Sequence, residues 1–460
     1  MPLIDRRSFL ATSAAAVAAP ALGAVPASGD VDVVIVGAGA AGIAAARRFA
    51  AAKKRFALVE ASYRVGGRCI TDTATFGAPF DRGAHWIHMP DINPVSQVAT
   101  KAGIDVYAAP PGQKVRIGRR YAREAEMEDY LSALVRAKRA IDDASRKGDG
   151  SCAQALPKDL GDWQRTIEFN LGPWSCAKEL SEVSALDFAK SAERDIDAFC
   201  RIGYGGMLAR LADGIEAQLS APVTRIGWGG KSGVEVETAR GKFTARAVIV
   251  TASTGILSAG KIKFTPELPR RQLDAAAKLS LGSYDHIVLE MPGNPLGLQR
   301  DELMFEKSQN LRTAGVLANV SGSTLCMVDV AGKFGRDLAA QGEPAMAAFA
   351  LEWLGGLYGT DLKKSVGRTA ATRWNDEPWV LGAFSAAAPG GQSARKIMME
   401  PLNARIWFAG EAAHETLWGT VGGAWESGDR AASEILKRLG GGAPEAQNER
   451  DRPRRKSNRS

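Results

Sequence analysis

The chain has 460 residues, of which 45% are hydrophobic and 24% charged, and its formal net charge is +8. This length suffices for two domains with sizeable cores, and the composition excludes a largely disordered chain. The sequence shows no basic–aromatic pattern of the kind that binds nucleic acid, and no apolar run long enough to span a membrane. We therefore predict neither a nucleic-acid partner nor a membrane anchor.

The N-terminal residues are predicted to form a targeting signal. The stretch Asp5–Leu10 is a twin-arginine pattern, and an Ala-rich apolar run with small residues near its end follows it. We predict a signal peptide at 1–27 and a periplasmic location, with a disordered N-terminal tag as the alternative. The tail at 441–460 is basic and lacks apolar periodicity, so we predict that it is disordered.

The five cysteines are scattered, odd in number and without CxxC spacing. This pattern predicts neither a metal site nor a disulfide framework. One bridge, Cys152–Cys176, remains open in an oxidising compartment, and the sequence does not decide it.

The segment from Val31 to Glu60 is the most informative stretch. It begins with a β-branched run typical of a buried parallel strand, continues as an Ala-rich stretch typical of a helix, and ends with a second short strand. A GxGxxG turn, formed by Gly37, Gly39 and Gly42, joins the first strand to the helix. The first glycine permits the tight turn, the second lets the backbone approach a pyrophosphate, and the third lets the helix pack on the strand.

The second strand, Phe56–Val59, is followed by Glu60, which lies 18 residues after Gly42. An acid about 20 residues beyond such a turn accepts hydrogen bonds from a ribose. Together these features predict a dinucleotide-binding βαβ unit whose helix N-terminus faces the phosphates. A Gly-rich turn in an ordinary βαβ unit is the alternative.

Two glycines beside an arginine follow in the sequence Arg64–Arg68, RVGGR. With the βαβ unit, this motif resembles the flavin monoamine oxidase superfamily, which binds FAD. The resemblance implies an α/β fold, with a Rossmann-like FAD-binding domain of the glutathione-reductase type and a mixed-sheet and helical substrate domain. Because the two glycines and the arginine lie just past the acid of the dinucleotide fold, we predict Arg68 on the pyrophosphate, with a surface turn as the alternative.

The stretch Gly83–His88, GAHWIH, followed by Asn93-Pro94-Val95, resembles a segment of the animal polyamine oxidases, although Met89 replaces a glycine. In that subgroup the second histidine lies beside the substrate channel, which implies this place for His88. Two histidines three residues apart would share one side of a helix or turn, where they could anchor a polar group or accept a proton. A buried histidine satisfied by hydrogen bonds is the alternative.

The middle of the chain carries fewer signals. We predict helices at 94–101, 122–146, 185–190 and 207–219, and then a series of short strands. The resemblance implies that the backbone of Val223 contacts the adenine.

The resemblance also divides the chain. It predicts a discontinuous FAD-binding domain from 28–95, 203–278 and 396–440, and a substrate domain from 96–202 and 279–395.

The strand at Ser283–Glu290 contains the most informative departure from the family. His286 aligns with a lysine that, in most members, holds a water against flavin N5. Histidine could hold a water or act as a base there, but its charge depends on pH near neutrality. Fast reaction with oxygen is therefore in doubt, and a strand residue without chemistry is the alternative for His286.

Phe384 occupies the position where the family places an aromatic ring over the flavin. Some members carry, just before it, a cysteine that bonds to FAD, whereas this chain has Ala383. We therefore predict non-covalent FAD.

The closing motif contains Gly410, Glu411, Trp418, Thr420 and Val421. A buried strand ends at the Gly–Glu pair, whose acid can accept from a sugar or ribityl hydroxyl. A helix N-terminus near Val421, pointed at the flavin N1/O2 edge, would stabilise the anionic reduced ring. The motif resembles the polyamine-oxidase form: Trp418 is expected to face the substrate, and Thr420 replaces the second cage tyrosine of monoamine oxidases.

We predict an FAD-dependent amine oxidase that acts on a polyamine or related amine, with catalytic-site residues His286, His88, Phe384 and Trp418. The hydride would pass to flavin N5, the imine would hydrolyse, and oxygen would be reduced to hydrogen peroxide. A flavin dehydrogenase with a periplasmic electron acceptor, an L-amino-acid oxidase and a non-catalytic FAD-binding protein are the alternatives. No carboxylate-binding arginine stands out beside the His88 segment, which weighs modestly against the amino-acid oxidase.

Overall fold

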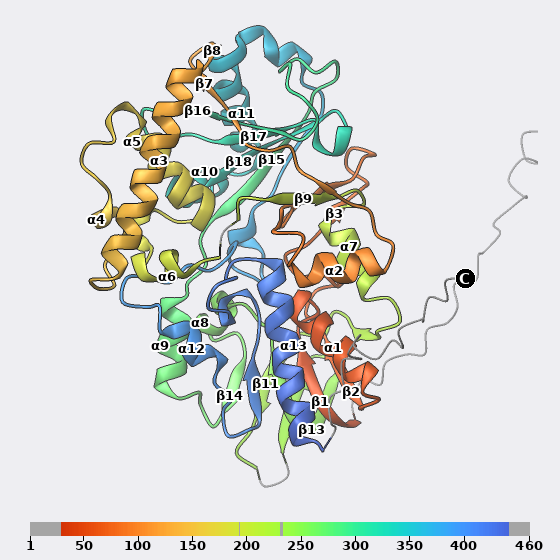
Figure 1. The fold of residues 1–460 in the computed structure, drawn as a ribbon. Coiled ribbons are helices and arrows are strands. Elements are labelled where there is room, and N and C mark those ends of the chain that lie inside the picture. The colour runs from red at the N-terminus through yellow and green to blue at the C-terminus, as the bar shows by residue number, and fades with distance from the viewer. Residues whose placement is uncertain (1–28, 193, 231–232, 441–460) are drawn as a thin grey trace, which may run out of the picture.

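The structure is a computed structural model that describes residues 29–192, 194–230 and 233–440. The predicted signal peptide at 1–27 and the basic tail at 441–460 lie outside the described residues. Two large sheets lie one above the other along the length of the molecule, and each has helices packed against it (Figure 1).

The lower sheet in Figure 1 has eight strands, in the order β10-β2-β1-β13-β12-β11-β14, with β20 paired to β13. In chain order its members are β1 (Gly29–Val36), β2 (Phe56–Val59), β10 (Ala217–Gln218), β11 (Val223–Gly227), β12 (Val234–Thr238), β13 (Gly241–Val250), β14 (Lys263–Thr265) and β20 (Ile406–Phe408). All of these strands come from the three segments predicted to form the FAD-binding domain.

The centre of this sheet is parallel because β1 runs beside β2 and β13, with Val34 opposite Ala57 and Val248. Helices α1 (Ala40–Ala51) and α13 (Val421–Arg438) cover one face. They approach closely at Gly428, where a Cβ would lie 2.0 Å from the carbonyl oxygen of Ala41. The first and last parts of the chain therefore form one layer.

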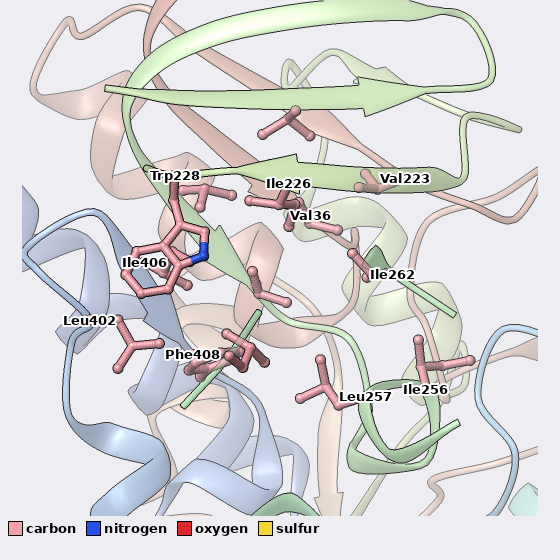
Figure 2. Close-up of a cluster of buried hydrophobic side chains, with 14 of the residues drawn as sticks. Val36, Val223, Ile226, Trp228, Ile256, Leu257, Ile262, Leu402, Ile406 and Phe408 are labelled. Atoms are coloured by element: carbon pink, nitrogen blue, oxygen red, sulfur yellow. The ribbon is translucent and has the colours of Figure 1, made fainter. Parts of the chain in front are cut away.

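The other face of the sheet buries the apolar cluster drawn in Figure 2, which includes Val36, Ile226, Trp228 and Phe408. The short helices α8 (Thr254–Ser258), α9 (Arg270–Lys278) and α12 (Ala394–Met399) contribute to this core. Burial on both faces explains why the central parallel segments, Val33–Val36, Phe56–Val59 and Ala247–Val250, have continuous apolar sequences.

The upper sheet has seven strands, in the order β19-β15-β18-β17-β16-β7-β8. In chain order these are β7 (Lys114–Ile117), β8 (Arg120–Tyr121), β15 (Tyr284–Glu290), β16 (Glu302–Glu306), β17 (Gly315–Ala318), β18 (Leu325–Ala331) and β19 (Thr369–Ala371). Helices α10 (Gly332–Ala339) and α11 (Glu343–Tyr358) pack on it. A helical layer beside it contains α3 (Glu124–Ser145), α4 (Cys152–Ala155), α5 (Gln164–Phe169) and α6 (Ala185–Lys190).

Two small sheets link the halves. One pairs β3 (Thr71–Asp72) with β4 (Phe80–Asp81), and the other has the order β5-β9-β6, from β5 (Ile87–His88), β9 (Asp197–Cys200) and β6 (Val106–Ala108). The second sheet crosses the domain boundary predicted at residue 95. Helices α2 (Pro94–Lys101) and α7 (Tyr204–Leu211) pack with α1 in the same apolar cluster.

The expected helix at 207–219 differs from the structure. Helix α7 begins at Tyr204 and ends at Leu211, and Ala217–Gln218 form an edge strand instead. Gly214 has a φ of +77°, a left-handed conformation that glycine adopts readily and that turns the chain back toward the sheet.

All five cysteines lie within the described residues, and each is buried as a free thiol, including Cys152 and Cys176. Within the same ranges no helix is both long and apolar enough to cross a bilayer. The part of the chain that the structure describes also contains no cluster of three or more metal-ligating side chains.

Candidate functional site

A strip of backbone at the end of β1 forms one end of the site. Gly37 turns with a φ of +101°, and Gly39 is the N-cap of α1 without any side-chain cap. Gly67 lies opposite, so close that a Cβ there would come within 3.1 Å of the Gly39 Cα. Uncapped N–H groups at a helix N-terminus, with no side chain in the way, fit a pyrophosphate.

Glu60 follows β2 and is 7% exposed. Its Oε2 accepts a hydrogen bond from the Ala38 N–H at 2.7 Å, and its Oε1 accepts one from the Ser62 N–H at 2.8 Å. Burial raises the pKa of this carboxyl, and these hydrogen bonds oppose the increase. A carboxylate has about four acceptor positions, so two donors leave capacity for ribose hydroxyls.

One cavity of about 600 Å³ extends from this strip into the region between the two sheets. Its volume lies within the range of small-molecule and cofactor sites. Twelve of the fourteen residues predicted for the site line it: Gly37, Gly39, Glu60, Arg68, His88, Val223, His286, Phe384, Gly410, Glu411, Thr420 and Val421.

The other two predicted residues do not line the cavity. Gly42 lies inside α1, where a Cβ would meet the Gly37 carbonyl oxygen at 1.8 Å, so it serves helix–strand packing as its position in GxGxxG suggests. Trp418 was expected to face the substrate, but it is 1% exposed, and its indole N–H donates to the Asp187 carbonyl. It belongs to the core of the helical layer, because the turn before α13 directs its ring away from the cavity.

Arg68 lines the cavity and bonds to other residues of its wall. One of its guanidinium nitrogens donates to the Ala383 carbonyl at 2.6 Å and to the Glu411 carboxylate at 2.9 Å. The other oxygen of Glu411 accepts from the Ser385 hydroxyl at 2.7 Å and the Gly419 N–H at 3.0 Å. Glu411 thus ties three segments of the wall together.

The N-terminus of α13 opens into the cavity. Thr420 is its N-cap, with Oγ1 accepting from the Gly423 N–H at 3.0 Å and donating to the Leu417 carbonyl at 2.7 Å. Its hydroxyl is therefore used for the cap, and Val421 follows as the first helical residue. The positive end of the helix dipole favours a negative charge beside it.

His286 is 4% exposed and lies directly opposite Asp329 in the antiparallel pair β15–β18. Its Nδ1 bonds to Asp329 Oδ1 at 2.6 Å, and its Nε2 donates to the Gly83 carbonyl at 2.8 Å. Because both partners are acceptors, both ring nitrogens carry protons and the ring is an imidazolium. Burial lowers the pKa of His286, but Asp329 and Gly83 outweigh burial and raise it to about 9. Neither nitrogen is left to hold a water or act as a base.

His88 lies in an extended strand rather than in the helix or turn considered from its spacing with His85. Its Nδ1 bonds to Asp197 Oδ1 at 2.6 Å, and both side chains keep partial exposure of 29% and 21%. His85 is 3% exposed and bonds through Nδ1 to Asp81 at 2.8 Å. Only the second histidine therefore combines solvent access with a carboxylate partner.

Aromatic rings line a second part of the cavity, the aromatic chamber, away from the glycine strip formed by Gly37, Gly39 and Gly67. Tyr284 lies with its ring centroid 6.0 Å from Phe384 and 5.7 Å from Trp174, and its hydroxyl donates to Asp329 at 3.0 Å. Neither Tyr284 nor Trp174 was among the residues predicted for the site, although both line the cavity. Tyr284 precedes His286 by two residues, so the period of a strand places both on one face and could have identified it.

Arg194 is a further residue of the cavity wall that was not predicted from the sequence. No carboxylate-binding arginine stands out beside the His88 segment in the sequence, but Arg194 lines the same cavity as His88 from another segment. Nothing in the local sequence around residue 194 marks it as a site residue.

The comparisons with known proteins agree with this geometry. A family model described as "Flavin containing amine oxidoreductase" matches residues 40–436. The chain is 26% identical over 446 residues to human "Lysine-specific histone demethylase 2", covering 88% of this chain and 53% of that protein. It is also 26% identical over 443 residues to "Polyamine oxidase 4" of Oryza sativa subsp. japonica, covering 88% of this chain and 89% of the relative. The chain thus spans about half the length of the demethylase.

Solved structures share the fold. Putrescine oxidase bound to putrescine aligns with a TM-score of 0.76 and 22% identity, over 89% of this chain and 100% of that one. Cyclohexylamine oxidase from Brevibacterium oxydans IH-35A aligns with a TM-score of 0.74 and 21% identity over the same shares. The FAD-binding fold predicted from the sequence is confirmed.

Proposed function

The chain belongs to the flavin-containing amine oxidoreductase family, and on this premise we propose that it oxidises a polyamine or related amine at a C–N bond. The single observation that carries the proposal is the continuous cavity, which joins the glycine strip for a dinucleotide to the aromatic chamber around Phe384. Bound FAD would supply a two-electron acceptor for the hydride on the carbon next to nitrogen, and water would hydrolyse the resulting imine to a carbonyl compound and an amine.

The residues of this chain hold and orient the reactants. The N-terminus of α1 and Glu60 fit the pyrophosphate and ribose, and the N-terminus of α13 fits an anionic ring edge. Phe384 and Tyr284 form apolar walls that disfavour a charged ammonium at the reacting nitrogen. An amine therefore enters the chamber most readily after it loses a proton.

His88 is the residue we propose as the acceptor of that proton. Its bond to Asp197 orients the ring and leaves Nε2 as the acceptor nitrogen. We expect His88→Gln to slow flavin reduction by the amine, because a glutamine side chain cannot accept the proton. Asp197→Asn should reproduce part of the loss, and the double variant should be no slower than His88→Gln, because Asp197 acts through His88.

The electron acceptor is proposed to be oxygen, which two electrons and two protons convert to hydrogen peroxide. The alternative is a dehydrogenase that passes electrons to another carrier, and the bonding of His286 supports considering it, since no ring nitrogen is available to hold a water. The twin-arginine pattern at Asp5–Leu10 supports the further proposal that the protein is exported to the periplasm.

The test is anaerobic. The FAD-loaded protein is mixed with spermine, spermidine, putrescine, phenylethylamine and L-amino acids in turn, and the absorbance of the oxidised flavin is followed. Bleaching by an amine supports the proposal, and peroxide on admitting air identifies oxygen as the acceptor. Bleaching by dithionite but by no amine would leave a non-catalytic FAD-binding protein as the better account.

A further inference from the structure

The wall of the cavity contains a guanidinium, that of Arg194, for which the described residues offer no carboxylate partner. Arg194 donates from Nη2 to the Trp418 carbonyl at 2.6 Å, while its Nε is buried and makes no hydrogen bond to the described residues. Within those residues no carboxylate forms an ion pair with it. Charged groups removed from water are normally paired, so an arginine that lines a cavity without a carboxylate among the described residues points to a ligand.

A neighbouring arginine shows what a structural guanidinium looks like in this fold. Arg395 also lies against the Trp418 ring, 4.8 Å from its centroid, compared with 5.0 Å for Arg194. It is fully buried, does not line the cavity, and bonds to the two oxygens of Asp187 at 2.6 and 2.7 Å. The charge of Arg395 is therefore paired within the protein, whereas the described residues provide no such pair for Arg194.

The position of Arg194 associates it with the aromatic chamber. The Ala192 N–H donates to the Thr416 carbonyl at 2.9 Å, and Arg194 bonds at Trp418, so this segment follows the turn that precedes α13. Three residues further on, Asp197 bonds to His88. The guanidinium therefore lies on the segment that joins the α13 turn to the His88 strand.

We propose that Arg194 binds a carboxylate of the substrate, so that the related amine of the proposed function is an amino acid. A planar guanidinium matches a carboxylate with two parallel hydrogen bonds. The same cation would repel the distal ammonium groups of a polyamine. The inference rests on the proposed function for its chemistry: an α-amino acid would yield a 2-oxo acid and ammonia, and an ω-amino acid would yield an aldehyde acid and ammonia, with two electrons passing to FAD in each case.

The experiment compares substrates that differ only in the carboxylate. The pairs are L-phenylalanine with phenylethylamine, L-ornithine with putrescine, and 4-aminobutyrate with propylamine, each mixed anaerobically with the FAD-loaded protein. We expect the wild type to be bleached faster by the acid of at least one pair. Arg194→Met should slow bleaching by that acid at least about 30-fold, without slowing its decarboxylated partner. Arg194→Lys should recover part of the loss.

A binding readout separates this inference from the proposed function. Benzoate is titrated against the flavin absorbance, and we expect its Kd to rise at least about 30-fold in Arg194→Met. The matched control is Arg116→Met, which removes another buried guanidinium that donates to Leu357 and lies outside the cavity. This control should leave unchanged both the ratio of the bleaching rates with acid and amine (the acid-to-amine ratio) and the benzoate Kd.

Two results would overturn the inference. In the first, the decarboxylated amines bleach the wild type faster than the acids do, and Arg194→Met changes neither the acid-to-amine ratio of bleaching rates nor the benzoate Kd. The other is an Arg194→Met protein that loses FAD or shifts the flavin reduction potential while the acid-to-amine ratio stays the same, because the guanidinium would then serve the cofactor. Arg194-dependent benzoate binding without bleaching by any amine would refute the proposed function and support the carboxylate site.

Discussion

The buried pair His286–Asp329 should make the stability of this protein depend on pH in a defined window. The two side chains are 5% and 0% exposed and bond at 2.6 Å, so solvent does not screen them. Burial lowers the pKa of the histidine, and Asp329 with the Gly83 carbonyl more than compensates, raising it from 6.5 to about 9. The folded chain therefore holds this proton more tightly than the unfolded chain does.

The sign and size of the effect follow from that difference. A raised pKa contributes stability that is fully present below pH 6.5 and is lost as pH rises through about 9. The interval from 6.5 to about 9 corresponds to about 3 kcal/mol of unfolding free energy. Asp329→Asn removes the charge that retains the proton. The difference in unfolding free energy between this variant and wild type should therefore be largest below pH 6.5 and small above pH 9.

The assay is urea denaturation of the FAD-loaded protein at pH 6, 7.5 and 9.5, followed by tryptophan fluorescence. Asp301→Asn is the matched control, because Asp301 is also buried and ion-paired, but with Arg300, which does not titrate in this window. It should lose stability equally at all three pH values. Buried thiols titrate alike in every variant, so the difference from wild type isolates His286. The reasoning fails if Asp329→Asn shows a stability deficit that does not change between pH 6 and 9.5.

Three further predictions concern burial and the cofactor. Arg395→Met leaves Asp187 buried and uncompensated, so urea denaturation should show a loss of about 3–5 kcal/mol, which Asp187→Leu in the same chain largely restores; a single-variant loss below about 1 kcal/mol would contradict the buried pair. Because Ala383 replaces a cysteine, acid precipitation should release all FAD into the supernatant, and flavin retained in the pellet would show a covalent bond. Ellman's reagent should leave the native protein unmodified and label all five thiols after unfolding without reductant, whereas fewer labelled thiols would reveal a disulfide.

Local patterns predicted the dinucleotide half of the fold well. The strand Phe56–Val59 and the helix 94–101 agree with the structure to the residue, because a short apolar run ending in an acid and a proline preceded by an N-capping asparagine are strong local signals. The GxGxxG turn likewise places Gly37 and Gly39 on the cavity, since its glycines act within a few residues of one another.

Contacts between distant segments could not be predicted in the same way. The ion pair of His286 with Asp329 depends on the register of two antiparallel strands. Arg194 reaches the cavity only because its segment bonds to the turn at Trp418, 224 residues later. The place of Trp418 could not be predicted either. Its ring packs in the core of the helical layer and not on the cavity, and this choice depends on helices that are distant in the sequence.

The most direct test of the central claim is an anaerobic single turnover with product analysis. The FAD-loaded protein is mixed with the amine or amino acid that bleaches its flavin fastest, and the carbonyl product is trapped and quantified against the reduced flavin. Oxidation at the C–N bond predicts carbonyl product in an amount equal to the flavin reduced. Bleaching without a carbonyl product, or no bleaching by any amine or amino acid while dithionite reduces the flavin, would contradict the claim.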